Sequence, residues 1–322
     1  MLQDKSISRR EALIVAVGIA VGATLSRAQD AAKPQAADEP IIDIHQHTTY
    51  RGRSDEALLH HQKKMGVTQT ILLPGGRPVF RESTLNGRAN GLEAAAGDVN
   101  TVMPIVKAHP GEYFFGANDV PDLADSHDQI VKQLKEGAVC IGEQKFNLAV
   151  DSPEMEMIYR LAEEYQVPLL MHFQAGAYNT GFERLGKVLA KWPKVKFVAH
   201  AQTFWANIDA NNVDDPKRLY PKGPVKAGGL SDKYLSDYAN FFGDMSAGSG
   251  LSAMTRDEDH ARGFLDRHQD KLMYGSDCPD PAGEGPTCTG ASMIKVIRRL
   301  APSKEAERKI LYGNAKRQYK LL

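Results

Sequence analysis

The sequence predicts a single α/β domain folded as a (β/α)8 barrel of the TIM type. Eight apolar runs alternate with helical segments between residue 41 and the C-terminus. Most intervals between successive run ends are close to 30 residues, the length of one βα unit. The runs are continuously apolar, as expected for parallel strands buried on both faces. Eight such units in a chain of 322 residues match the size of this barrel.

The first 28 residues are typical of an export signal peptide and are set aside from the fold. An uncharged apolar run over residues 13–25 precedes the small-x-small sequence Ser26-Arg27-Ala28. The run is too short to span a bilayer comfortably. Ser8-Arg9-Arg10 resembles a twin-arginine export signal, and an ordinary secretory signal or an uncleaved anchor is the alternative. We therefore expect a periplasmic or secreted protein without stable membrane association after cleavage.

The composition excludes several classes of protein. Forty basic residues balance forty acidic ones, so nothing indicates a nucleic-acid partner or an anionic membrane surface. Three cysteines are too few for a disulfide scaffold. Residues 29–40 are rich in Ala, Asp, Gln and Pro and predict a flexible lead-in. The barrel domain is expected to cover residues 41–322.

Apolar runs bounded by turn residues place the elements in order. Strands are expected over residues 41–45, 67–73, 113–116, 138–143, 167–172, 195–200, 240–244 and 272–277. Helical spacing of apolar residues predicts helices around 58–65 and over 87–106, 121–136, 153–165 and 181–191. The turn-rich 200–240 segment is expected over the barrel mouth, where loops carry specificity. A doubly wound sheet is disfavoured, because no Gly-x-Gly-x-x-Gly turn follows an early strand.

Five polar residues share one feature, which is that each ends an apolar strand: His45, His47, His172, His200 and Asp277. The C-terminal ends of barrel strands meet on one face, where active sites are built. Imidazole nitrogens and a carboxylate suit Zn²⁺ or a similar divalent ion. An ion with an open position would bind water and lower its pKa, and Asp277 could take the proton.

The chain resembles the amidohydrolase superfamily of metal-dependent hydrolases. It is most similar to the amidohydrolase-related branch that includes aminocarboxymuconate-semialdehyde decarboxylase and dicarboxylate lactonases. The matching segments are 42–47, 171–172, 199–201, 274–279 and 310–315. The resemblance implies that His45, His47 and His172 bind the metal. It also implies that His200 binds a second metal or the nucleophilic water, and that Asp277 ligates the metal and shuttles the proton.

The fourth strand leaves the number of ions open. Binuclear members of the family place a carbamylated Lys or a Glu there, and this chain has both Glu143 and Lys145. Glu143 could bridge two ions, Lys145 could be carbamylated, or the two could form an ion pair that supports the histidines. The expected cofactor is Zn²⁺, as one ion or two.

Three residues are candidates for contact with a small-molecule substrate. Arg256, after strand seven, and Arg77, after strand two, could clamp a carboxylate, with a surface position as the alternative. Trp205 could wall the pocket or pack in the core. Cys278 is more simply a small buried residue than a ligand. The other histidines are expected to be solvated or to cap helices: His60, His61, His109, His127, His260 and His268.

The sequence therefore predicts a metal-dependent hydrolase that acts on a small amide, ester or lactone through a metal-activated water. A non-oxidative decarboxylase of an aromatic or unsaturated carboxylic acid would use the same ligands. A non-catalytic periplasmic ligand- or metal-binding barrel is disfavoured by the complete ligand set. The absence of a Gly-x-Ser-x-Gly elbow argues against a serine hydrolase. Loops 204–240 offer a contact for a homo-oligomer.

Overall fold

A computed structural model describes residues 39–77, 91–92 and 95–321. The expected signal peptide at 1–28 and most of the lead-in at 29–40 lie outside the described residues. Pro40–Leu322 form one compact unit. No helix in the described ranges is long and apolar enough to cross a membrane.

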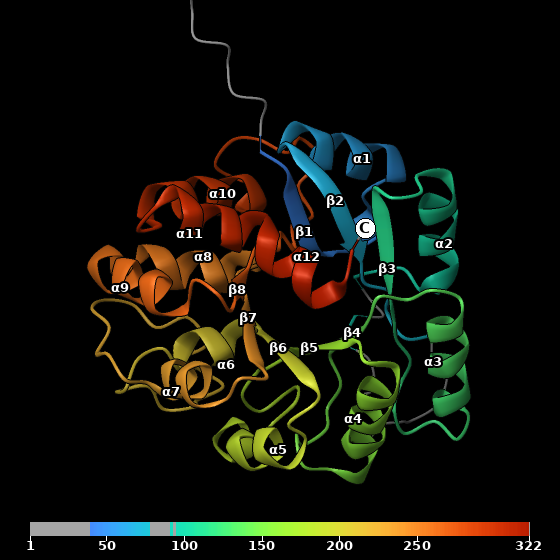
Figure 1. The fold of residues 1–322 in the computed structure, drawn as a ribbon, viewed down its shortest axis with the longest axis horizontal. Coiled ribbons are helices and arrows are strands. Elements are labelled where there is room, and N and C mark those ends of the chain that lie inside the picture. Colours follow the sequence, from blue (N-terminus) through green and yellow to red (C-terminus); the bar gives the residue numbers. More distant parts are fainter. Residues whose placement is uncertain (1–38, 78–90, 93–94, 322) are drawn as a thin grey trace, which may run out of the picture. The chain divides into compact units, whose positions relative to one another are not determined.

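Eight parallel strands follow one another around the sheet in chain order (Figure 1). Backbone hydrogen bonds from Ile44 N to Tyr274 O (3.2 Å) and from Asp277 N to His45 O (2.8 Å) join the last unit back to the first. The result is a nearly closed barrel, which confirms the predicted fold class. The strands are β1 Ile41–Gln46, β2 Val67–Leu72, β3 Tyr113–Ala117, β4 Cys140–Gln144, β5 Pro168–His172, β6 Lys196–His200, β7 Phe241–Asp244 and β8 Leu272–Met273.

Helices lie between the strands in sequence and cover the outside of the barrel (Figure 1). They are α1 Asp55–Lys64, α2 Val99–Ala108, α3 Ser126–Lys135, α4 Pro153–Tyr165, α5 Leu185–Lys191, α6 Ala201–Ala206, α7 Leu230–Asp237, α8 Ala247–Thr255, α9 Glu258–His268, α10 Thr289–Leu300, α11 Lys304–Arg308 and α12 Asn314–Tyr319. Short helical turns are η1 Tyr50–Gly52, η2 Phe182–Arg184 and the π-helical η3 Lys309–Gly313.

Capping side chains explain where two of these helices begin. α4 has the predicted bounds, because Ser152 accepts a hydrogen bond from Met155 N and Pro153 occupies the first turn. The helix expected over 87–106 begins only at Val99, where Asp98 accepts from Asn100 N (3.0 Å). The described residues just before it form bends and turns, and 87–90 lie outside the described ranges. The N-cap at Asp98, and not the helical spacing of apolar residues, therefore sets the start of this helix.

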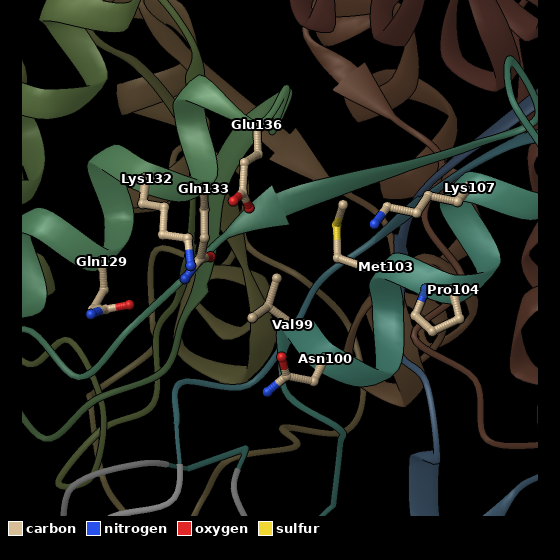
Figure 2. Close-up of a pocket in the computed structure, with 9 residues that line it drawn as sticks. All are labelled: Val99, Asn100, Met103, Pro104, Lys107, Gln129, Lys132, Gln133 and Glu136. Carbon is tan, nitrogen blue, oxygen red and sulfur yellow. The ribbon is translucent and has the colours of Figure 1, made fainter.

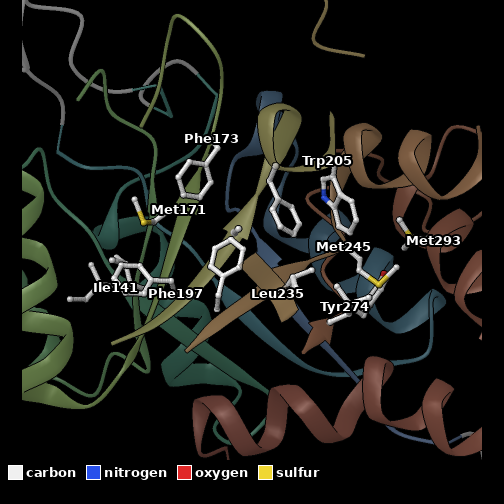
Figure 3. Packing of buried hydrophobic residues seen from close by; sticks show 14 of the residues in the cluster. Ile141, Met171, Phe173, Phe197, Trp205, Leu235, Met245, Tyr274 and Met293 are labelled. Atoms are coloured by element: carbon white, nitrogen blue, oxygen red, sulfur yellow. The ribbon is translucent and has the colours of Figure 1, made fainter. Parts of the chain in front are cut away.

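Strand residues alternate between two apolar clusters, because successive side chains point to opposite faces. Leu170, Val198 and Phe242 belong to a cluster that also contains Ala315 and Tyr319 from α12. The neighbouring positions on the same strands pack in a larger cluster with the surrounding helices (Figure 3), which includes Met171, Phe197, Trp205 and Leu235. His172, His200 and Asp244 each follow Leu170, Val198 or Phe242 by two positions. Because side chains alternate along a strand, these three polar residues lie on the same inward face.

Candidate metal centre

His45 at the end of β1 and His47 just beyond it meet two carboxylates at the carboxyl ends of the strands. His45 Nε2 and His47 Nε2 lie 3.2 Å apart. Glu143 Oε2, from β4, lies 3.2 Å from the first and 3.3 Å from the second. Asp277 Oδ1, just beyond β8, lies 3.8 Å from His45 Nε2 and 3.5 Å from His47 Nε2. These four side chains from three strand ends thus surround one small space.

The second oxygen of Glu143 faces the histidines of β5 and β6. Glu143 Oε1 lies 2.6 Å from His172 Nδ1 and 3.7 Å from His200 Nε2. His200 Nε2 also lies 3.5 Å from Asp277 Oδ2. Glu143 therefore lies between two pairs of imidazoles, and each of its carboxylate oxygens faces one pair. All five predicted residues come together, and Glu143 lies in their midst.

Each histidine has one ring nitrogen that faces away from the cluster, and its hydrogen-bond partner there assigns the tautomer of the neutral ring. His45 Nδ1 donates to Asp244 Oδ2 (2.7 Å), and His47 Nδ1 donates to the backbone oxygen of Leu73 (2.6 Å). Each ring therefore directs the lone pair of Nε2 into the cluster.

The same holds for the histidines of β5 and β6. His200 Nδ1 donates to Ser246 Oγ (2.8 Å), which in turn donates to Asp244 Oδ2 (2.9 Å). His172 Nε2 lies 3.3 Å from Gln174 Oε1, to which it donates. His200 thus directs Nε2, and His172 directs Nδ1, towards Glu143 as lone pairs.

A divalent cation fits this arrangement. When every histidine is neutral, these tautomers make the inward atoms all acceptors, and none supplies a hydrogen to its neighbours. His200 Nε2 and Asp277 Oδ1 are buried and have no hydrogen-bond partner among the described residues. Buried polar atoms of this kind require a partner, and a cation can serve every acceptor at once. Nitrogen and carboxylate donors in this number suit Zn²⁺ or a similar ion.

The protonation equilibria agree with an excess of negative charge. Burial lowers the pKa of His45, but the carboxylates of Asp277, Glu143 and Asp244 outweigh burial and raise it well above its ordinary value. Burial raises the pKa of Asp277, but His45 and His47 outweigh it and hold that pKa below its usual range. Burial, together with the positive charge of His45, lowers the pKa of His200 to about 4. In the cation-free protein, the proton on His45 Nε2 thus lies where a cation would bind.

Cation affinity should therefore rise with pH. Because the folded pKa of His45 is raised, its proton must leave when Nε2 binds an ion, so binding should release at least one proton. Affinity should increase as pH rises, and level off once pH passes that pKa. Calorimetric titration with Zn²⁺ in buffers of different ionisation enthalpy would count the protons. Affinity that stays constant between about pH 6 and 8, the range in which histidines ordinarily titrate, would contradict this assignment.

Sequence reasoning missed two residues that orient the ligands. Asp244 and Ser246 are buried. Asp244 accepts a hydrogen bond from His45, and Ser246 accepts one from His200. A signal for Asp244 was present, because it ends the apolar run of β7 as the predicted ligands end theirs. Its role is to hold the rings of His45 and His200 in one tautomer, a role that carboxylates commonly play behind metal-binding histidines.

Asp244→Asn should weaken cation binding without removing a ligand. The amide cannot serve as the charged acceptor for His45 Nδ1, so we expect affinity to fall by about 10- to 100-fold. Competition with a fluorescent chelator would measure the change. Asp237→Asn, an exposed position on α7, is the matched control. An unchanged affinity in the Asp244 variant would show that Asp244 does not set the tautomer.

The segment that carries Asp277 is tied to β1. Asp43 accepts from Ser276 N (2.9 Å) and Ser276 Oγ, and Gln46 Nε2 donates to Ser276 Oγ (2.9 Å). A Cβ at Gly275 would lie 2.4 Å from Asp244 Oδ1, so only glycine fits there. β1 and this segment therefore position their ligands together.

Tyr50, which sequence reasoning also missed, stands beside the cluster. Its ring centre lies 5.0 Å from that of His47. The Asp277 carboxylate, burial and Glu143 raise the pKa of Tyr50, so its hydroxyl keeps its proton. Tyr50 can therefore act as a hydrogen-bond donor at the edge of the site.

The candidate substrate residues make contacts with other groups. Arg77 pairs with Asp119 (3.0 Å) and Asp125, and Arg256 Nη2 lies 3.6 Å from Asp209 Oδ2. Trp205 is buried and donates from Nε1 to the backbone oxygen of Asp244 (3.1 Å). Trp205 thus supports β7 from behind, and none of the three is among the side chains that meet at the cluster.

The surroundings of Lys145, and those of two other histidines, differ from what the sequence predicted. The ammonium of Lys145 lies 5.6 Å from the ring centre of Tyr178, and the ion pairs that Glu143 makes within the described ranges are with histidines, not with Lys145. His61 and His268, expected to be solvated or capping, are buried, and His268 Nε2 lies 2.5 Å from Asp232 Oδ1. That expectation was wrong for both, because packing of α1 and α9 against the barrel covers them.

A groove of about 600 Å³ lies on the outer layer, between α2 and α3 (Figure 2). Its lining residues are Val99, Asn100, Met103, Pro104, Lys107, Gln129, Lys132, Gln133 and Glu136. None of them belongs to the histidine cluster. The groove is therefore separate from the candidate metal centre.

Comparison with known proteins agrees with this geometry. The family model described as "Amidohydrolase" matches residues 42–321. No curated protein sequence matches the chain. An uncharacterised TIM-barrel protein from Bordetella bronchiseptica is similar in structure, with a TM-score of 0.59, 14% identity, and coverage of 88% of this chain and 99% of that one.

Two similar solved structures have named activities. One is a probable 2-pyrone-4,6-dicarboxylic acid hydrolase from Acinetobacter baumannii (TM-score 0.52, 14% identity, covering 88% of this chain and 100% of that one). The other is 5-carboxyvanillate decarboxylase from Sphingomonas paucimobilis (TM-score 0.50, 16% identity, covering 82% of each chain). At such identities the likeness shows the shared fold.

Proposed function

Because this chain belongs to the amidohydrolase family and is an enzyme of that type, we propose that it is a metal-dependent hydrolase of a small amide, ester or lactone. The observation that carries the proposal is the position of Glu143. One oxygen faces His45 and His47 and the other faces His172 and His200. A carboxylate in this position would be able to serve two cations at once, and two-metal sites occur in phosphatases, nucleases and aminopeptidases.

The residues divide into two sets around Glu143. His45, His47 and Asp277 would hold one cation, and His172 and His200 would hold a second. When bound, such cations polarise a substrate oxygen and lower the pKa of water. Zn²⁺ is our proposed ion, as one or two equivalents.

Asp277 is the proposed proton carrier. Its pKa is held below the usual range, so it is ionised at neutral pH, and Oδ1 has no hydrogen-bond partner among the described residues. It would take a proton from the attacking water and pass it to the leaving group. The Tyr50 hydroxyl, which keeps its proton, would donate a hydrogen bond to the substrate or to Asp277. His200, neutral because its pKa is lowered to about 4, would act through its Nε2 lone pair.

The products distinguish hydrolysis from decarboxylation of an aromatic or unsaturated acid. The purified protein, loaded with Zn²⁺, would be offered a panel of small lactones, esters, amides and aromatic acids. We expect acid release in a pH-stat from a lactone or ester, or amine release from an amide, without CO₂, and no turnover after chelation. CO₂ release from an acid, with no hydrolysis of any lactone, ester or amide, would replace this proposal with a decarboxylase.

We also propose that the protein is exported and acts on a small molecule in the periplasm or outside the cell. The support is the twin-arginine-like segment in residues 1–28. Fractionation of cells that express the full chain would test it. The Arg9→Lys/Arg10→Lys variant should keep the protein inside the cytoplasm.

A further inference from the structure

A second group of metal-binding side chains lies outside the histidine cluster. His61 comes from α1, Cys278 from the segment after β8, and Cys288 from the residue that precedes α10. All three are fully buried. Their donor atoms lie within 4.8 Å of one another. Three elements far apart in sequence thus bring two thiols and an imidazole to one point.

The spacing of the donor atoms is that of ligands on one ion. Cys278 Sγ and Cys288 Sγ lie 3.8 Å apart, and His61 Nε2 lies 3.4 Å from Cys288 Sγ. Two thiolates on a tetrahedral ion, each about 2.3 Å from it, are about 3.8 Å apart, and a thiolate and an imidazole nitrogen are about 3.6 Å apart.

A fourth soft donor stands beside these three. Met65 Sδ lies 3.7 Å from Cys288 Sγ. Met65 follows His61 by four residues, so α1 and its C-terminal residue present both side chains on one face. The group therefore offers two thiols, an imidazole and a thioether.

The start of α10 gives the sulfur of Cys288 one backbone donor. It precedes the 12-residue helix α10, and its Sγ accepts a hydrogen bond from Ala291 N (3.3 Å). The N-terminus of a helix favours negative charge. The hydrogen bond to Cys278 and burial raise the pKa of Cys288, and this backbone hydrogen bond opposes them.

We propose that His61, Cys278 and Cys288, with Met65 as a weaker fourth ligand, bind a thiophilic closed-shell cation, Zn²⁺ or Cu⁺. Thiolate and thioether donors select such ions. The site is distinct from the histidine cluster, whose inward donors are nitrogen and oxygen only. It does not depend on the proposed hydrolase activity.

The cation would brace the loop next to Asp277. Cys278 follows Asp277 directly, and its backbone oxygen accepts from Gln46 Nε2 (3.2 Å) and Arg53 Nη1 (2.8 Å). Binding would tie this segment to α1 and to the start of α10. Its role is therefore structural support of the residue on which the catalytic proposal depends.

Cobalt titration of the reduced full chain would test the site. Thiolate-to-Co²⁺ charge-transfer absorption reports sulfur ligands and is silent for the histidine cluster, so the result is independent of hydrolase activity. We expect this absorption in the wild-type protein, with a final intensity that corresponds to one sulfur-ligated ion per chain, and its displacement by Zn²⁺ or Cu⁺ identifies the preferred ion. Metal analysis should show one equivalent lost in the Cys278→Ser/Cys288→Ser variant.

Cys140→Ala is the matched control, because Cys140 is buried in the other apolar cluster and has no part in the group. It should keep the absorption. The measurement on the wild-type protein decides the matter even if the double variant does not fold. Absence of the absorption in the folded, reduced wild-type protein would overturn the proposal. So would a mass lower by two hydrogens in the protein as isolated from its native compartment, which would indicate a Cys278–Cys288 disulfide instead.

Discussion

Asp277→Asn should lower kcat/KM by about 10²- to 10⁴-fold on the best substrate of the panel, the range typical of a lost general acid–base group. The amide has nearly the same shape, so the loop held by Asp43 and Gln46 should keep its place. It cannot accept the proton, and it removes one negative charge from the face of His45 and His47. Steady-state kinetics at saturating Zn²⁺, with metal content measured in parallel, would separate loss of proton transfer from loss of the ion.

The matched control is Asp237→Asn, which makes the same chemical change at an exposed position. It should leave kcat/KM unchanged. Full activity in the Asp277 variant with its metal retained would remove Asp277 from the mechanism. Loss of both metal and activity would make it chiefly a ligand.

Glu143→Gln should have an effect of similar size on activity and a larger one on metal content. An amide nitrogen in place of either oxygen would present hydrogens to a cation site, so at least one equivalent of metal should be lost. In the metal-free protein the change also removes a buried partner of His45 and His172, which typically costs about 3–5 kcal/mol. Metal analysis and thermal unfolding with and without Zn²⁺ would measure both effects.

Glu112→Gln, at an exposed position, controls for the loss of a carboxylate. If the Glu143 variant bound as many ions as the wild-type protein, the carboxylate could not be a shared ligand. The site would then hold its cation through His45, His47 and Asp277 alone. This outcome would leave the hydrolase proposal without its main support.

The continuously apolar runs and the βα spacing predicted most of the fold. They placed all eight strands and put His172 and His200 at strand ends, because parallel strands end on a common face whatever the details of packing. They were less informative about α2, where a local cap at Asp98 decided the start. They placed Asp244 at a strand end as well, but a carboxylate there can equally well face solvent, so its contact with His45 could not be predicted.

Local rules along the chain determined the barrel and the approach of five polar side chains to its rim, because strand alternation and βα length depend on neighbouring residues only. Tertiary structure alone decided which ring nitrogen faces inward, since this depends on partners such as Asp244 and Leu73 in other units. Tertiary structure also placed Glu143, and not Lys145, among the histidines, and it placed His61 beside Cys278 and Cys288. These outcomes depend on strand register and helix packing, in which residues hundreds of positions apart come within hydrogen-bonding distance.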